Sequence, residues 1–230
     1  LQRVEHLIKV NSGNVSKYNL MYYNNRKAAL FSEYYHNPDS TLFYSKKALA
    51  LSKELRDNPI EFTSLMEIGY AYEIKKNYLE AVEYYVKAYE ISKAKRTESE
   101  SCDALVNMSR IYEKMGEYKI ALEKCNEGLA IMKKRDNLIQ KLLLYDIRQN
   151  IYEKTGDKTL ALNNVKERLK YTDLYHEKNA KDKLIEANKK YDILEREREN
   201  EKRKKDIEEI KKNQLLLLSI ILLFVLGLIS

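Results

Sequence analysis

Residues 62–92 read FTSLMEIGYAYEIKKNYLEAVEYYVKAYEIS, and they form two apolar stripes on either side of a turn near Asn77. Small residues, such as Gly69 and Ala81, allow two antiparallel helices to approach closely, and a large residue such as Tyr85 fills the space between them. The stretch therefore predicts a helical hairpin. Its first stripe holds Leu65, Ile68, Gly69 and Tyr72, and its second holds Ala81, Tyr85 and Ala88.

The same pattern returns along the chain with a constant period of 40 positions. Three independent columns of residues keep this interval, and the third of them ends where Arg168 replaces a small residue. A fixed period of this length predicts an all-α solenoid of stacked helix hairpins, in which each hairpin packs against its neighbours. The columns are Tyr72, Tyr112 and Tyr152; Thr41, Ala81, Ala121 and Ala161; and Ala48, Ala88 and Gly128.

The spacing of these residues resembles the tetratricopeptide repeat (TPR) signature, in which Leu-Gly and Tyr precede an Ala-x3-aromatic pair and a further Ala. Two departures distinguish this chain from the usual repeat. Its period exceeds the common value of about 34 residues, and Lys93 occupies the place of the Pro that usually closes a repeat. The resemblance implies a TPR-like solenoid over residues 1–172.

The helix boundaries carry their own signals. Asn37 and Asn58 are each followed by Pro, a combination typical of a helix start, and Thr97 stands where a capping box would begin. Gly116 and Gly156 are expected to end helices, because glycine readily adopts the left-handed conformation. Residues 1–10 align with the second helix of a hairpin, so we expect the chain to begin inside a repeat.

The composition is that of a helical protein that does not bind nucleic acid. The 230 residues include only 2 Pro and 6 Gly, and one third of them are charged. The net charge of +7 is spread along the chain and forms no basic stripe that could follow a phosphate backbone. Cys102 and Cys125 are expected to be buried free thiols, and without a CxxC or Cys/His cluster neither a metal nor a cofactor is predicted.

Nothing in the sequence indicates catalysis. It contains no glycine-rich phosphate loop, nucleophile elbow or HExxH motif. His176 precedes a Glu, as in phosphoacceptor histidine boxes, but it lacks the apolar residue and Pro that accompany such boxes, so a solvated helix face is the favoured interpretation. We therefore expect no enzyme within these residues.

Residues 173–214 are expected to form a charged helical stalk. Leu184, Ala187, Tyr191 and Leu194 follow the 3-4-3 spacing of a coiled-coil seam. The spacing resumes at Ile207, one position short of two full heptads after Leu194, so the seam slips between them. Two interpretations remain open: a homodimeric coiled coil, and a single helix stabilised in water by Glu–Lys and Glu–Arg pairs.

Residues 215–230, LLLLSIILLFVLGLIS, contain no charge and predict a truncated transmembrane helix, since 16 residues fall short of the roughly 20 that span a bilayer. A buried terminal helix is the alternative. The Lys and Arg residues before Leu215 favour a cytoplasmic location for the N-terminal part, but interspersed acidic residues weaken that rule here. The side of the membrane stays open.

In TPR proteins, the first helix of each hairpin lines a concave surface that binds partners. Carried over to this sequence, that surface would suit an extended peptide, while a solvated groove without a ligand is the alternative. Leu30, Met66 and Glu67 stand where chaperone-binding TPR domains carry clamp residues for a C-terminal carboxylate, so that class of partner is disfavoured. The predicted groove residues are Arg26, Leu30, Glu67, Tyr70, Asn107, Arg110, Asp146 and Asn150.

A TPR array followed by a charged helix and an apolar segment resembles bacterial membrane sensors that pass a signal to a histidine kinase or a helix-turn-helix regulator. This resemblance implies a single-pass protein of the bacterial inner membrane with its repeats in the periplasm. The expected function is then sensing, with the stalk carrying the signal to an effector beyond residue 230. A membrane-tethered scaffold without signalling output and a cytosolic adaptor anchored by its tail are the alternatives.

Overall fold

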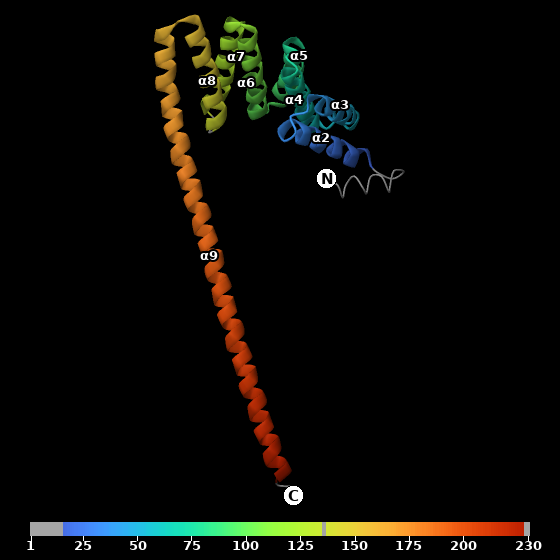
Figure 1. Ribbon diagram of the computed structural model, residues 1–230, viewed down its shortest axis with the longest axis vertical. Helices are drawn as coiled ribbons and strands as arrows, with labels where there is room; N and C mark the ends of the chain where they lie inside the picture. The colour runs from blue at the N-terminus through green and yellow to red at the C-terminus, as the bar shows by residue number, and fades with distance from the viewer. Residues whose placement is uncertain (1–15, 135–136, 228–230) are drawn as a thin grey trace. The chain divides into compact units, whose positions relative to one another are not determined.

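The computed structural model describes residues 16–134 and 137–227, and over these residues it contains helices and no strand. The predicted all-α fold is thereby confirmed for these residues. Residues 1–10, where we expected part of a preceding repeat, lie outside the described residues. The helices are α2 (Lys17–Glu33), α3 (Pro38–Leu55), α4 (Asn58–Ile74), α5 (Tyr78–Lys95), α6 (Glu98–Met115), α7 (Tyr118–Ile131), the short η1 (Met132–Lys134), α8 (Leu138–Thr155) and α9 (Lys158–Gly227) (Figure 1).

The period read from the sequence reappears in the helix boundaries. The first helices of three successive hairpins, α4, α6 and α8, begin at Asn58, Glu98 and Leu138. The second helices α3, α5, α7 and α9 keep the same interval, beginning at residues 38, 78, 118 and 158. Consecutive helices run side by side as antiparallel pairs, with α4 against α5 and α6 against α7 (Figure 1). The sequence repeat is therefore a structural unit.

Most of the described turns contain one residue in the left-handed conformation. From His36 to Gly116 these residues stand half a period apart, and Gly156 follows Gly116 by one full period. Gly116 has φ 81°, and Lys76, one full period earlier, adopts φ 60° without the freedom of a glycine. At both turns the next N–H donates back across the turn to a carbonyl of the preceding helix, as when Glu117 N donates to Tyr112 O at 2.9 Å. The complete set of left-handed residues in the described part of the chain is His36, Arg56, Lys76, Arg96, Gly116 and Gly156.

The helix starts agree with the sequence at one position and differ at two. The side chain of Asn37 caps α3 by accepting from Ser40 N at 3.0 Å, as predicted. The predicted cap Asn58 is wrong, because Asp57 accepts from Ile60 N at 3.0 Å and Asn58 is already helical. Thr97 is the N-cap residue of α6, but its hydroxyl donates to a Glu100 carboxylate oxygen at 2.6 Å and caps no backbone N–H. A carboxylate is a stronger acceptor than a neutral oxygen, so the hydroxyl turns toward it.

The core consists of successive clusters, each shared by three consecutive helices. One cluster joins α4, α5 and α6 through fully buried residues such as Ala81, Tyr85 and Leu105. The next joins α6, α7 and α8 around Ala121 and Leu144. Because each helix contributes to its neighbours' clusters, the stability of the array comes from nearest-neighbour packing.

The chain divides into two compact units, residues 1–175 and 176–230. The first contains the hairpins. The second is the continuation of α9, in which every residue from 180 to 215 is exposed. Among the residues that the structure describes, no helix is both long and apolar enough to cross a membrane. Of the predicted span 215–230, only the side chains of Leu215 and Leu218 are described, so the span gains no support.

Candidate functional site

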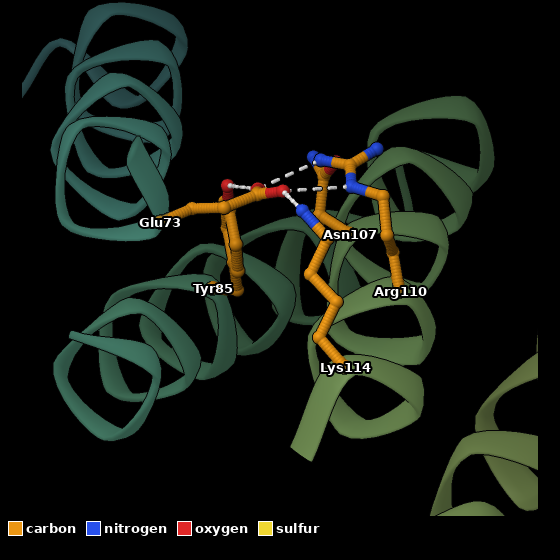
Figure 2. A network of polar contacts seen from close by, with 5 residues as sticks. All are labelled: Glu73, Tyr85, Asn107, Arg110 and Lys114. Carbon is orange, nitrogen blue, oxygen red and sulfur yellow. Dashed lines mark hydrogen bonds and ion pairs between the residues drawn. The ribbon is translucent and has the colours of Figure 1, made fainter. Parts of the chain in front are cut away.

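A buried carboxylate joins two neighbouring hairpins through several polar groups (Figure 2). The side chain of Glu73, on α4, is 6% exposed and accepts two hydrogen bonds from Arg110, at 3.0 and 2.9 Å. Lys114, one turn further along α6, donates to Glu73 at 2.7 Å, and Tyr85 of α5 donates at 3.2 Å. Arg110 also donates to Asn107 Oδ1 at 2.6 Å. We call these residues, Glu73, Tyr85, Asn107, Arg110 and Lys114, the Glu73 network.

The charges of the Glu73 network compensate one another. Burial alone would raise the pKa of Glu73, but hydrogen bonds and charge attraction from Arg110 and Lys114 outweigh it, and the pKa falls below its ordinary value. The bidentate geometry of Arg110 is the strongest form of such a contact. Burial together with the Glu73 charge raises the pKa of Tyr85, so its phenol stays a donor. The network thus holds Arg110 and Asn107 in fixed orientations.

One ion pair of the network recurs one period along the chain. Glu113 is buried on α6 and accepts from Lys154 of α8 at 2.7 Å, which repeats the contact between Glu73 and Lys114. The guanidinium is not repeated, because Asn150 stands one period after Arg110. The fully developed network therefore occurs at a single junction among the described hairpins.

Beside the Glu73 network, a pocket of about 330 Å³ collects side chains from four helices. Glu67 and Tyr70 reach it from α4, and Asn107 from α6, so three of the predicted groove residues meet here. Tyr85 belongs to both the pocket and the network and connects the two. We call this cavity the Glu67 pocket, and it is lined by Ser32, Glu33, Met66, Glu67, Tyr70, Tyr85 and Asn107.

Glu67 is the electrostatically unusual member of the pocket. Its Oε2 atom is buried and accepts no hydrogen bond from any residue that the structure describes. Burial raises the pKa of this carboxyl; a hydrogen bond from Ser32 opposes the rise, and the nearby Glu33 adds to it. A buried carboxylate oxygen without a donor costs free energy that a cationic group could recover. The pocket is therefore suited chemically to a positively charged side chain.

The other predicted groove residues lie apart from this pocket. Arg110 contacts Glu73 and Asn107 from the adjoining network. Asp146 forms an ion pair with Arg168 of α9. The remaining three do not line the pocket: Arg26 and Asn150 are exposed, and Leu30 is half-buried.

Sequence reasoning did not identify Glu73, Lys114 or Tyr85 as members of a polar network. A signal for Glu73 was present, because Glu33, Glu73, Glu113 and Glu153 stand one period apart. A column of charged residues in a helical repeat resembles a solvated face, and only the packing shows that two of these four carboxylates are buried.

Residues 61–134 match the tetratricopeptide repeat family. This match covers the best-formed hairpins and confirms the resemblance drawn from the residue columns. No curated protein shows significant sequence similarity to the chain.

Solved structures of TPR-like proteins share the fold at low sequence identity. Aspartyl phosphate phosphatase F from Bacillus subtilis is 15% identical, with a TM-score of 0.67 over 71% of this chain and 43% of that chain. BtubC from P. vanneervenii is 15% identical, with a TM-score of 0.64 over 71% and 67% of the two chains. TPR-like repeats from Podosopora anserina are 14% identical, with a TM-score of 0.62 over 76% and 85%. The chain thus spans less than half the length of the phosphatase.

Proposed function

We propose, from the tetratricopeptide repeats that this chain contains, that it binds an extended segment of a partner protein and that a basic side chain of that segment enters the Glu67 pocket. TPR-type helical repeats are protein-interaction domains, and the observation that carries the finer proposal is the unpaired, buried Oε2 of Glu67. A Lys or Arg side chain would supply the missing donor and neutralise the buried charge.

The neighbouring side chains suit the rest of such a ligand. Met66 and Tyr70 offer apolar surface for the aliphatic stem of a Lys or Arg. Asn107 uses its Oδ1 to accept from Arg110, which leaves its amide N–H groups to donate to a peptide carbonyl. Because Arg110 is itself held by Glu73, the Asn107 amide is oriented before a ligand arrives, and less entropy is lost on binding.

A peptide array tests this proposal. Short extended peptides carrying Lys or Arg are compared with matched peptides in which norleucine replaces the basic residue. We expect the chain to prefer the basic members and Glu67→Gln to reduce that preference by about tenfold or more. Glu123→Gln, which removes an exposed carboxylate from α7, is the matched control and should keep the preference. Equal binding of basic and norleucine peptides, or an unchanged preference in Glu67→Gln, would overturn the proposal.

A second candidate function is signalling through α9, supported by the continuity of this helix from Lys158 to Gly227. Its first turns belong to the last hairpin, where Asn164 donates to Tyr145 O at 2.8 Å. Peptide binding to the repeats should then change the rate of disulfide formation between copies carrying Leu194→Cys. An unchanged rate at saturating peptide would favour a scaffold without output.

Attachment to a bacterial inner membrane, with the repeats in the periplasm, belongs to this second candidate and rests on the apolar composition of residues 215–230. Cosedimentation with phosphatidylethanolamine and phosphatidylglycerol vesicles tests the attachment. The full chain should pellet with the vesicles, and a chain ending at Gln214 should stay in solution. Equal partition of the two chains would remove the membrane from the proposal, and protease digestion of the repeats in intact spheroplasts would support the periplasmic side.

A further inference from the structure

The second unit presents an apolar seam to solvent. Leu184 is 61% exposed, Tyr191 65% and Leu194 47%. Helices in proteins gain most of their stability from packing an apolar face against a partner, and a helix without one is only marginally stable in water. The described part of this unit, residues 176–227, contains a single helix and so supplies no such partner itself. An exposed apolar face of this kind would be stabilised by packing against a second chain.

The seam has a definite heptad register. With Leu184 and Tyr191 at positions a, Ala187 and Leu194 fall at positions d. Continuing the same register places charged residues at the next four core positions, Arg198, Glu201, Lys205 and Glu208. Ile207 and Ile210 then lie outside the core, because they belong to the second register that begins after the slip. The apolar core is therefore short, and the flanking positions e and g must determine which partner binds and in which direction.

The flanking charges are self-complementary. In a parallel two-stranded coiled coil, each g residue faces the e residue five positions later on the partner helix. This rule brings opposite charges together three times in succession and, by symmetry, on both sides of the seam. The three pairs, each joining one copy to the other, are Lys190 with Glu195, Glu197 with Lys202, and Lys204 with Glu209.

We propose that residues 184–209 pair in parallel and in register with a second copy of this chain. The seam supplies apolar burial at its N-terminal end, and the g–e pairs set the direction and extend the contact beyond Leu194. The charges at Arg198 and Lys205 keep the association weak, and the exposed g–e pairs make it sensitive to salt. The pairing is thus a reversible interface.

Two charge variants with opposite signs test the pairing. The first places lysine at every g and e position of the three pairs, and the second places glutamate there. Each variant should repel itself and dissociate at least about tenfold more readily than the natural chain, whereas a mixture should form heterodimers with every pair attractive again. The first variant carries Glu195→Lys, Glu197→Lys and Glu209→Lys; the second carries Lys190→Glu, Lys202→Glu and Lys204→Glu.

Sedimentation of the full chain and capture of an untagged copy by a tagged one measure the association. The matched control changes three basic residues on the outer face of the helix, Lys189→Glu, Arg196→Glu and Arg203→Glu, and should stay dimeric with the same change of net charge as the glutamate variant. A natural chain that sediments as a monomer at all concentrations, or charge variants that fail to capture each other, would overturn the proposal.

The direction of pairing is tested by cysteine crosslinks. Parallel, in-register helices bring Leu184→Cys opposite itself and also bring Leu194→Cys opposite itself, so both single variants should form disulfide-linked dimers. Ile193→Cys, one position away from the seam, should react much more slowly. In an antiparallel pair, only a residue at the centre of the contact lies next to the same residue of the other copy. A crosslink at Leu184→Cys or at Leu194→Cys alone would therefore contradict the proposal.

Discussion

The ring of Tyr85 lies directly against the backbone of Gly69, so closely that a Cβ atom added at Gly69 would meet Tyr85 Cε1 at 2.6 Å. Tyr85 is fully buried, and its hydroxyl is held by Glu73. The ring therefore cannot move away from Gly69, and this contact requires the small residue that the TPR-like signature has at position 69.

Gly69→Ala should destabilise the protein, although alanine is the better helix former. Overpacking against a fixed ring costs about 1–3 kcal/mol, which exceeds the gain of about 1 kcal/mol in helix propensity. Gly128→Ala is the matched control, because its Cβ would meet the movable end of Leu144 at 2.8 Å. Urea denaturation should show the larger loss for Gly69→Ala, and adding Tyr85→Leu should recover part of it. Equal losses would contradict the role given to the ring.

Glu73→Gln should destabilise the junction between two hairpins by about 2 kcal/mol at neutral pH, because it removes the charged acceptor shared by Arg110 and Lys114. The folded-state pKa of Glu73 is lowered, so its contribution is present above the unfolded value near 4.5 and is lost as the pH falls through the folded-state pKa. Thermal unfolding at several pH values measures this. Glu153→Gln, the exposed equivalent two periods along, should change little.

Glu67→Gln should stabilise the unliganded protein at neutral pH by about 1 kcal/mol, since it replaces a buried charge that lacks one partner. The folded-state pKa of Glu67 is raised, so the wild type loses stability as the pH rises from the unfolded value of 4.5 through the folded-state pKa. The two proteins should therefore match at low pH and diverge above it in thermal melts. Lower stability of Glu67→Gln at neutral pH would show that Oε2 has a partner besides the hydrogen bond that Ser32 gives the carboxylate.

Lys76→Gly should stabilise the protein by about 1 kcal/mol, because glycine adopts the left-handed conformation without the cost that a side chain incurs. Gly116 occupies the same turn position one period later, and Gly116→Ala should lose a similar amount. Among the described residues, no atom other than those of Gly116 and its chain neighbours lies within 4 Å of a Cβ placed there, so this loss would report the backbone alone. Denaturant midpoints compare the two changes, and shifts of the same sign would contradict this explanation.

Cys102 and Cys125 should resist alkylation in the folded protein. Burial raises the pKa of the Cys102 thiol to about 12 and that of Cys125 to about 11, so neither is a thiolate near pH 8. Iodoacetamide labelling followed by mass spectrometry should modify both only after denaturation. Leu79→Cys, at a position 72% exposed in the natural chain, provides the reactive control.

The hairpins could be predicted from the sequence because their packing repeats. Residues such as Ala81 and Ala121 are completely buried at the same place in successive hairpins, so one physical requirement is visible at two points of the chain. The cap at Asp57 escaped prediction because the neighbouring Asn58-Pro59 carries a similar signal, and the two interpretations differ by a single residue.

The candidate site could be predicted only in part. The sequence predicted three of the pocket residues, because the first helix of each hairpin lines the groove in TPR proteins. These residues, Glu67, Tyr70 and Asn107, do share a pocket. Asp146 forms an ion pair with Arg168, the residue at which a column of small residues ends. Because Arg168 departs from the periodic pattern, the period could not predict which residue it contacts. Long charged side chains reach across hairpins, so their contacts depend on geometry.

The recurrence of left-handed residues at equivalent turns makes each hairpin a modular unit of the chain. Lys76 and Gly116 occupy equivalent turns, each closed by the same kind of backbone hydrogen bond, so residues 77–116 could be excised and the flanking segments joined without a new type of turn. Glu73 would then meet Lys154 and Asn150 in place of Lys114 and Arg110, and the shortened protein would keep a junction like the one it already has at Glu113. Growth or loss of whole hairpins by recombination would thus require no new kind of contact where the ends meet.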